Sequence, residues 1–184
     1  MGPSEGEGNS PLRPDIGSGD KGSEMIRLER IISGGQTGAD QAALDVAIEL
    51  GIPHGGWVPK DRRTEEGPLP AKYRMKEMPS DSYPKRTEQN VIDSDGTLII
   101  SHGDLSEGSD YTRMMAAKHG KPWIHIDADK HSVEVAVQMI RTWISGNDIE
   151  VLNVAGPPAS KDAQIYVTTK TLLKAVLFSS YEDD

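Results

Sequence analysis

The chain has 184 residues, no cysteine and a formal net charge of −9 at pH 7. This length corresponds to about one domain, and the lack of cysteine excludes disulfides, thiolate metal sites and cysteine nucleophiles. No apolar run approaches the roughly 20 residues that span a membrane, and the N-terminus lacks the basic and apolar segments of a signal peptide. We therefore expect a cytoplasmic protein that does not contact a membrane.

Most of the negative charge lies near the two ends of the chain. Residues 1–24 contribute −3, from five acidic and two basic residues, and the acidic run 182–184 contributes another −3. The abundance of Gly, Pro and Ser at 1–24 predicts a disordered leader, followed by one ligand-binding domain at 25–180 and an acidic tail at 181–184. Because charge in the domain is nearly balanced, we do not expect a nucleic-acid surface.

Apolar runs and helix-capping signals alternate along this domain. We expect strands at 27–32, 55–58, 97–101, 122–126 and 150–156, and helices at 38–50, 83–93, 109–119, 131–144 and 160–178. Ser82 is the expected N-cap of the helix at 83–93, and Ser160 is expected to open the last helix. The loops that follow the expected strands include 33–38, 59–82, 102–109 and 155–160. Repeated strand–helix units predict a single Rossmann-like three-layer α/β domain, in which a parallel sheet of about five strands has helices on both faces. Ligands bind such sheets at the carboxyl ends of the strands, so a site is expected in these loops.

The first of these loops, "SGGQTG" at 33–38, joins a strand to a helix through three glycines. It matches the dinucleotide-binding fingerprint only in part, and the acidic residue that would hold a ribose is missing from the end of the next strand. A classical NAD site is therefore disfavoured. Glycines allow close approach of a ligand to the backbone, and the N-terminus of a helix attracts anions. We expect a phosphate on the backbone N–H groups of residues 35–38.

Two polar residues in this stretch have two open interpretations. Thr37 and Asp40 have the spacing of a capping box, which would satisfy N–H groups at the start of the helix. Alternatively, Asp40 lies within one helical turn of the expected ligand and contacts one of its hydroxyl or amino groups. We favour ligand contact for Asp40 and keep helix capping as the alternative.

The segment 60–86 is basic within an acidic protein. It contains eight Lys and Arg residues against five acidic ones, with four prolines and no clear periodicity. Long irregular connections inside a compact domain are usually functional or disordered. We interpret this one as a lid over a bound anion, with Lys60 and Arg62 as candidate phosphate contacts. Tyr73 and Tyr83 bracket the lid and are candidates for stacking on a ring.

A second turn rich in Gly and Ser lies at 101–112, "SHGDLSEGSDYT", and leads into a helix. Ser109, Asp110 and Thr112 have the side chains to cap that helix. If the strands before the two turns flank the point where the strand order reverses, both helix N-termini converge on one crevice. Two positive helix ends and a basic lid predict a phosphate pocket.

Several motifs together resemble one known family. "GGQTGAD" at 34–40, "RTEQNV" at 86–91 and "LNVAGPPASK" at 152–161 are similar to the putative molybdenum carrier proteins. This family is a YpsA-related branch of the Rossmann-like superfamily that also holds the cytokinin-activating LOG (lysine-decarboxylase-like) proteins, and the resemblance covers about residues 26–178. It implies a Rossmann-like fold that binds a nucleotide-like or pterin-phosphate ligand, commonly as a homo-oligomer. The cofactor it implies is the molybdenum cofactor or a nucleotide.

One departure from the relatives bears on catalysis. The phosphoribohydrolase relatives carry Gly-Gly-x-Gly-Thr-x-x-Glu, whose Glu performs the chemistry, and no Glu follows Thr112 at the matching position. The resemblance therefore implies a binding or carrier protein more than an enzyme. Two alternatives stay open. One is a hydrolase that acts on an N-glycosidic or phosphate bond of a nucleotide through Asp40, Glu65 or Glu66, and the other is a scaffold with a vestigial pocket.

The candidate ligand-binding residues come from the two turns, the lid and one face of the helix expected at 83–93. They are Ser33, Gly34, Gly35, Gln36, Thr37, Gly38, Asp40, Lys60, Arg62, Arg86, Asn90, Gly108, Ser109 and Thr112. No His and Asp spacing fits a standard metal site, so we expect none. No set of serine, histidine and acid is recognisable, so the sequence names no catalytic residue.

Overall fold

The computed structural model describes residues 25–178, so the predicted leader at 1–24 and the acidic tail at 181–184 lie outside the described residues. Five parallel strands form the main sheet in the order β2-β1-β9-β7-β8. They are β1 (Arg30–Ile32), β2 (His54–Gly55), β7 (Gly96–Ser101), β8 (Trp123–Asp127) and β9 (Val151–Ala155). The last strand of the chain therefore lies at the centre of the sheet, between β1 and β7.

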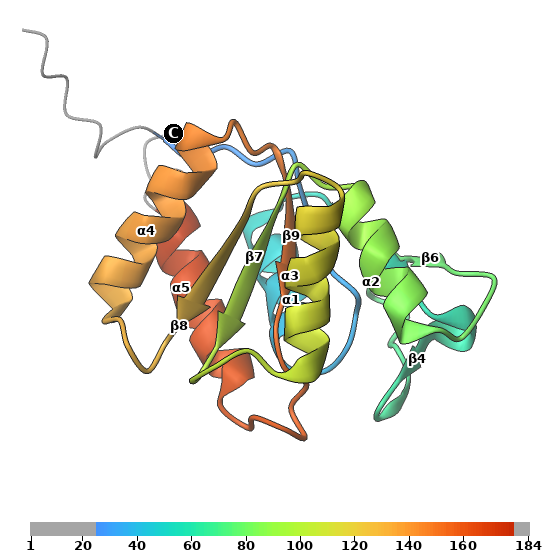
Figure 1. The fold of residues 1–184 in the computed structure, drawn as a ribbon. Helices are drawn as coiled ribbons and strands as arrows, with labels where there is room; N and C mark the ends of the chain where they lie inside the picture. The colour runs from blue at the N-terminus through green and yellow to red at the C-terminus, as the bar shows by residue number, and fades with distance from the viewer. Residues whose placement is uncertain (1–24, 179–184) are drawn as a thin grey trace, which may run out of the picture.

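Within the described residues, α-helices cover both faces of the sheet. They are α1 (Ala39–Leu50), α2 (Tyr83–Ile92), α3 (Glu107–Lys118), α4 (Val133–Gly146) and α5 (Ile165–Phe178). α1, α4 and α5 pack on one face, and α2 and α3 lie on the other (Figure 1). The expected Rossmann-like α/β domain with a parallel five-stranded sheet is thereby confirmed. None of the helices described here is long and apolar enough to cross a membrane.

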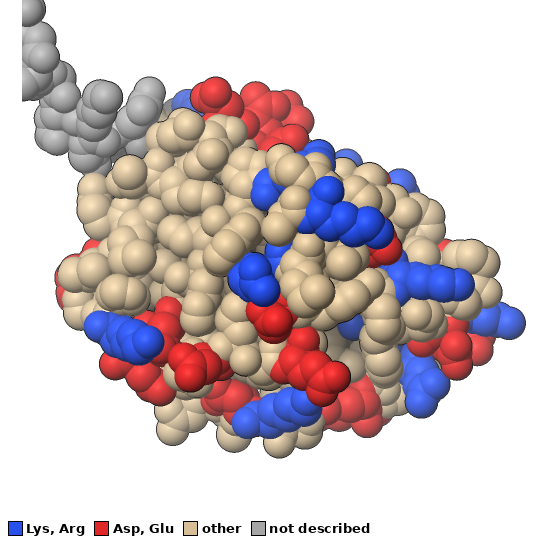
Figure 2. Space-filling model, viewed as in Figure 1, with Lys and Arg blue, Asp and Glu red and all other residues tan. Residues whose placement is uncertain are grey.

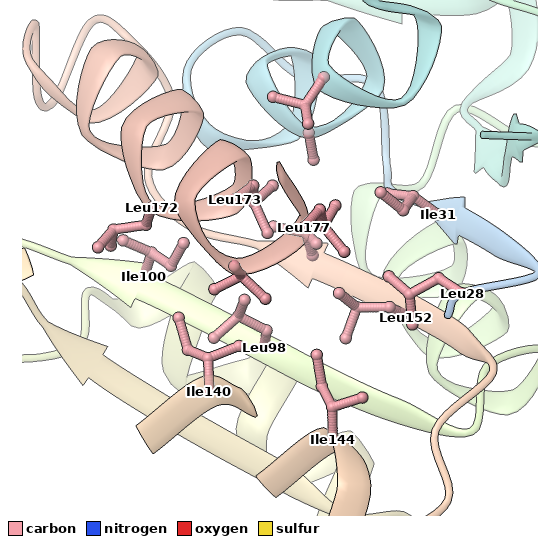
Figure 3. Close-up of a cluster of buried hydrophobic side chains, with 14 of the residues drawn as sticks. Leu28, Ile31, Leu98, Ile100, Ile140, Ile144, Leu152, Leu172, Leu173 and Leu177 are labelled. Atoms are coloured by element: carbon pink, nitrogen blue, oxygen red, sulfur yellow. The ribbon is translucent and has the colours of Figure 1, made fainter. Parts of the chain in front are cut away.

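The larger hydrophobic core lies between the sheet and the layer of α1, α4 and α5. Ile31, Leu98 and Leu152 of the central strands pack with Leu173 and Leu177 of α5 (Figure 3). β7 is buried along its whole length, as expected of a central parallel strand with helices on both faces. This close-packed core holds the strands in place beneath the loops at their carboxyl ends.

The chain between α1 and α2 makes an excursion beside the main sheet (right side of Figure 1). It contains β3 (Trp57–Val58), the 3-10 turn η1 (Lys60–Arg62), β4 (Arg63–Thr64), β5 (Gly67–Pro68) and β6 (Lys76–Glu77). β3 pairs with β6, and β4 and β5 form an antiparallel hairpin. The single strand expected at 55–58 is therefore divided between two sheets. Gly56 permits the division, because its φ of 119° suits glycine and a Cβ there would lie 2.3 Å from the carbonyl oxygen of Ser33.

The starts of two helices on the α2–α3 side differ in how well the sequence predicted them. Ser82 caps α2 through its side chain, as predicted. The capping residue of α3 is Ser106, whose hydroxyl accepts a hydrogen bond from the N–H of Ser109 at 3.4 Å. The predicted caps Ser109, Asp110 and Thr112 are wrong, because α3 begins earlier and these residues lie inside it.

The last helix starts later than predicted. α5 begins at Ile165, and the chain from residue 159 to residue 164 forms turns in place of the first helical turn. Ser160 was expected to open this helix, but its hydroxyl donates to the carboxylate of Glu65 in the β4–β5 hairpin. Ser160 thus contacts a distant segment of the chain and does not begin the helix as the local pattern predicted.

Candidate functional site

A cavity of about 580 Å³ opens at the carboxyl ends of β1, β9 and β7, between α2 and α3. Along the chain, β1 is followed by β2 on one side of the sheet and β7 by β8 on the other, so the strand order reverses at this place. Its wall comes from the turn after β1, from α2, from the first turns of α3, and from the end of β9 with the loop that follows. Both its position and its volume are typical of small-molecule sites in α/β proteins.

Asp40 of α1 and Arg86 of α2 form a buried ion pair in the wall of this pocket. Asp40 Oδ2 lies 3.3 Å from Arg86 Nη1 and accepts a hydrogen bond from the N–H of Gln36 at 3.2 Å. Burial disfavours the charged form and raises the pKa of Asp40 to about 6, although Arg86 and the Gln36 N–H act in the opposite direction. The pocket therefore contains a carboxyl group that changes charge near neutral pH.

Arg86 is held by its surroundings on two sides. A Cβ on Gly34 would lie 1.5 Å from Arg86 Nη1, so the guanidinium occupies space that a side chain at 34 would fill. The guanidinium carbon lies 5.4 Å from the centre of the Tyr83 ring, which is a cation–π distance. Arg86 Nε is buried and has no hydrogen-bond partner among the described residues. A fixed, planar cation with unused donor capacity thus borders the pocket.

The glycine turn after β1 uses its own side chains as hydrogen-bond acceptors. The N–H of Gly35 donates to Ser33 Oγ at 3.3 Å, and the N–H of Thr37 donates to Gln36 Oε1 at 3.0 Å. The N–H of Gln36 donates to Asp40, as described above. The expected phosphate site on the N–H groups of 35–38 therefore has no free donor at residues 35, 36 and 37.

The expected capping box of Thr37 and Asp40 does not form. Gly38 is the residue that precedes α1, and no side chain caps this helix end. Thr37 Oγ1 accepts a hydrogen bond from the N–H of Ala159 at 3.1 Å and donates to the carboxylate of Glu65. Segments distant in the sequence close this end of α1, so helix capping explains neither residue.

The tip of the β4–β5 hairpin is fastened over the same turn. Glu65 Oε1 accepts a hydrogen bond from the N–H of Ser160 at 3.1 Å, and the carboxylate also accepts from the hydroxyls of Ser160 and Thr37. Donation by the two hydroxyls lowers the pKa of Glu65. The segment interpreted as a lid is thus attached through a carboxylate.

The two bases predicted for the lid lie outside the pocket. Arg62 donates to the backbone oxygens of Leu69, Pro70 and Tyr73, at 3.1, 2.8 and 2.7 Å respectively. It therefore folds the excursion onto itself, and Lys60 is exposed. Tyr73 is buried in a small core, so it is not available to stack on a ligand as the sequence suggested.

The α3 wall offers hydroxyl groups beside a helix N-terminus. Ser106 Oγ donates to Ser109 Oγ at 3.3 Å, and Thr112 Oγ1 donates to the carbonyl of Gly108 at 3.2 Å. Lys161 borders the same pocket from the loop after β9. The positive end of the α3 dipole and this lysine together favour an anion on this side of the pocket.

The predicted candidates divide into two groups. Those that line the pocket are Gly34, Gln36, Asp40, Arg86, Asn90, Gly108, Ser109 and Thr112. Those that lie outside its wall are Ser33, Gly35, Thr37, Gly38, Lys60 and Arg62. Members of both groups also support the structure. Asn90 Oδ1 accepts a hydrogen bond from the Trp57 N–H at 2.8 Å, and Asn90 Nδ2 donates to the Trp57 carbonyl at 3.0 Å. Ser33 Oγ donates to the backbone carbonyl of Asp40 at 3.0 Å. Ligand contact by any of these residues stays a prediction.

Part of the wall was not among the predicted candidates. Residues 153–156 of β9 and the following loop, Lys161, and Tyr111 of α3 all border the pocket. The loop at 155–160 follows an expected strand, which is a signal, but no local pattern reveals that this strand lies between β1 and β7. Tyr83, suggested as a stacking residue, does line the pocket.

On the face drawn in Figure 2, the charged side chains form no single block. Lys and Arg are interspersed with Asp and Glu over the face drawn in Figure 2. Within residues 25–178, no three or more His, Asp and Glu side chains are grouped so that they could hold a metal ion. The groups that the pocket itself offers are a guanidinium, an ammonium, carboxyls, side-chain amides, hydroxyls and two phenol rings.

A family model and a solved structure match the chain. Residues 31–177 match the model of the circularly permutated YpsA SLOG family. The chain is also similar to the crystal structure of a putative molybdenum carrier protein from Syntrophus aciditrophicus SB, with 54% sequence identity and a TM-score of 0.83. That alignment covers 84% of this chain and 98% of the other. No curated protein matches the sequence.

Proposed function

The chain belongs to the circularly permutated YpsA SLOG family, and from that premise we propose that it binds a phosphorylated small molecule with a planar ring, of the nucleotide or pterin class. The observation that supports this most is that Arg86, Lys161, Tyr83 and Tyr111 all line one cavity of about 580 Å³. Cations bind phosphate and polarised ring atoms, and tyrosine rings pack against planar ligands. A cavity of this volume is in the range of small-molecule sites.

We place the phosphate at the α3 wall. Lys161 and the N-terminal end of α3 supply positive potential there, and Ser109 supplies a hydroxyl donor. Glu107 also lines the pocket at this helix end, and it is exposed like Lys161, so water and salt screen both of these charges. The glycine turn after β1 is not needed for the phosphate, because its N–H groups at residues 35–37 already have acceptors.

We place the ring beside the ion pair of Asp40 and Arg86. A carboxylate accepts hydrogen bonds from ring N–H and amino groups such as those of guanine and pterin, and a guanidinium donates to ring nitrogens and carbonyls. Tyr83, whose ring contacts the Arg86 guanidinium, borders the pocket as well. Ligands that lack ring N–H donors should therefore bind less tightly than those that have them.

The carrier role is supported by the structural neighbour and by the chemistry of the wall. That neighbour is named a putative molybdenum carrier protein. A phosphorylated pterin such as that of the molybdenum cofactor has both groups for which the pocket offers partners, a phosphate and a ring with N–H donors. We therefore propose such a pterin, or a nucleotide, as the cargo, and any molybdenum would enter as part of it.

A second candidate function is hydrolysis of a bound nucleotide. One observation favours it: burial raises the pKa of the pocket carboxyl Asp40 to about 6, and a group that titrates near neutral pH is suited to proton transfer. Glu65, which with Glu66 was also predicted for this role, is held by Thr37 and Ser160. Release of base or phosphate from a nucleoside monophosphate, lost in Asp40→Asn, would establish this second function.

Thermal unfolding with paired ligands tests the proposed binding. Guanosine monophosphate and a pterin phosphate should each raise the melting temperature of the full chain, with a shift that grows with ligand concentration above the Kd. Guanosine and the unphosphorylated pterin should raise it much less, because they lack the group that Lys161 and the α3 end attract. Equal shifts with and without the phosphate would contradict the phosphate site.

Two lysines provide a matched comparison for this experiment. Lys161→Ala removes the cation that borders the pocket and should weaken binding of guanosine monophosphate about tenfold, or about 1.4 kcal/mol. Lys60→Ala removes an exposed lysine outside the pocket and should leave the Kd unchanged. Equal losses in both variants would indicate only a general effect of net charge.

A further inference from the structure

A second, smaller cavity lies away from the proposed ligand pocket, beside the N-terminal parts of α4 and α5. Its volume is about 210 Å³, and it shares no lining residue with the larger pocket. Ala128, Val133, Ala136, Val167 and Leu172 make most of its wall apolar. A cavity of this size and polarity suits a short hydrocarbon chain and not a nucleotide.

Two polar residues in the wall of this cavity belong to a hydrogen-bonded chain. His102 Nδ1 lies 2.6 Å from Asp162 Oδ2, and His102 Nε2 lies 3.1 Å from Thr168 Oγ1. His102 and Thr168 line the cavity, and Asp162 lies behind the imidazole. His102 directly follows β7, Asp162 lies in the loop after β9, and Thr168 lies in the first turn of α5. Only the fold brings these three residues together.

The partners of His102 fix its tautomer when the ring is neutral. A carboxylate can only accept, so the Nδ1 that faces Asp162 carries the proton, and Nε2 is left to accept a hydrogen bond from the Thr168 hydroxyl. Asp162 is itself oriented, because its Oδ1 accepts from the N–H of Gln164 at 3.0 Å. These are the relations between acid, base and nucleophile in a hydroxyl-based catalytic triad.

The hydroxyl of Thr168 also departs from what a helical threonine usually does. Ser and Thr side chains inside helices commonly hydrogen-bond to the carbonyl four residues earlier. Thr171, which lines the same cavity, follows this pattern and donates to the Val167 carbonyl at 2.9 Å. The hydroxyl of Thr168, less than one turn earlier in the same helix, is instead within hydrogen-bond distance of the imidazole.

We propose that Thr168, His102 and Asp162 form an acyl-transfer site for esters with a short acyl chain, independent of the ligand-binding function. Thr168 Oγ attacks the ester carbonyl carbon while His102 Nε2 takes the hydroxyl proton. The bond from that carbon to the leaving oxygen then breaks, and the alcohol leaves with the proton from His102. The product is an acyl ester of Thr168.

Water completes the reaction. His102 Nε2 takes a proton from a water molecule that attacks the acyl carbon, the bond to Thr168 Oγ breaks, and the proton returns to that oxygen. Asp162 holds the imidazole and stabilises its charge in both steps, and the N-terminal end of α5 provides positive potential for the developing oxyanion. The apolar cavity holds the acyl chain.

The test uses the full chain with p-nitrophenyl acetate and p-nitrophenyl butyrate. Wild-type protein should release p-nitrophenol above the buffer rate, and peptide mass spectrometry should locate an acyl group on Thr168. Thr168→Val and His102→Gln should lower the protein-dependent rate about a hundredfold or more, because each removes nucleophile or base. Thr142→Val removes an exposed hydroxyl of α4 that lies outside the cavity, and should keep the wild-type rate.

A conservative variant separates chemistry from structure. Thr168→Ser keeps the hydroxyl, so it should retain acylation even if it lowers the melting temperature, whereas Asp162→Asn should lose activity through the wrong imidazole tautomer. Acyl groups found only on lysines, or wild-type rates in folded Thr168→Val, would overturn the proposal and leave the three residues as a link between the β7–α3 loop and α5.

Discussion

At the scale of single residues, the pocket depends on how Asp40 and Arg86 balance each other. Both side chains are almost completely buried, with Arg86 filling the space beside Gly34. Removing one partner of a buried pair leaves an uncompensated charge, whereas an intact pair costs desolvation for both ions. The raised pKa of Asp40 reflects that cost, since burial outweighs the stabilisation that Arg86 gives to the carboxylate.

The raised pKa of Asp40 predicts the pH dependence of stability. Its folded-state value of about 6 is above the ordinary value for an aspartate, so the folded protein binds more protons between the two values. Stability that depends on this group therefore rises as the pH falls through about 6. Chemical denaturation of wild type and Asp40→Asn at several pH values measures it. As the pH is lowered from about 8 to about 5, the free energy of unfolding of wild type should increase relative to that of Asp40→Asn. A constant difference would contradict the raised pKa.

At the scale of the elements, the tip of the β4–β5 hairpin is held by the Glu65 carboxylate and by a hydrogen bond of 3.0 Å from the Glu65 N–H to Gln36 Oε1. Glu65 receives hydrogen bonds from Thr37, before α1, and from Ser160, in the loop after β9. A contact of this kind between an exposed carboxylate and three donors positions a loop without adding much to global stability. The hairpin is therefore the part of the pocket surroundings that should open most easily.

Substitution of the two neighbouring glutamates tests the hairpin attachment. Glu65→Gln removes the charge that the hydroxyls stabilise, so amide exchange at residues 63–68 and at Ser160 should become faster, with little change in global stability. Glu66→Gln changes the same charge one residue later and should leave exchange unchanged. Hydrogen exchange followed by mass spectrometry provides the readout. Equal exchange in wild type and Glu65→Gln would show that the carboxylate does not hold the hairpin.

Elements defined by local patterns could be predicted from the sequence, and those decided by tertiary contacts could not. The α2 cap at Ser82 and the apolar β7 strand carry strong local signals and are found as expected. The predicted start of α5 was wrong, because the Ser160 side chain binds Glu65 and the helix begins only at Ile165. Arg62 was predicted to bind phosphate, but its guanidinium donates hydrogen bonds to backbone carbonyls in the segment between α1 and α2.

At the scale of the whole molecule, the pocket is built from both ends of the described chain. β9 pairs with β1 on one side and β7 on the other, so Lys161 and the end of β9 meet a turn that is more than a hundred residues earlier. No local pattern specifies this long-range pairing. The same topology brought Asp162 to His102, which explains why the sequence suggested no hydroxyl, histidine and acid set.

Calorimetric titration of a pocket-blocking variant tests the central claim most directly. Gly108 lines the pocket in the first turn of α3, Gly146 ends α4 outside it, and a Cβ on either would have no neighbour within 4 Å. Both Gly→Trp changes should therefore be tolerated. Wild type and Gly146→Trp should bind guanosine monophosphate or a pterin phosphate with the same Kd, whereas Gly108→Trp should bind at least about tenfold more weakly. Equal Kd values in all three proteins would contradict a phosphorylated ligand in this pocket.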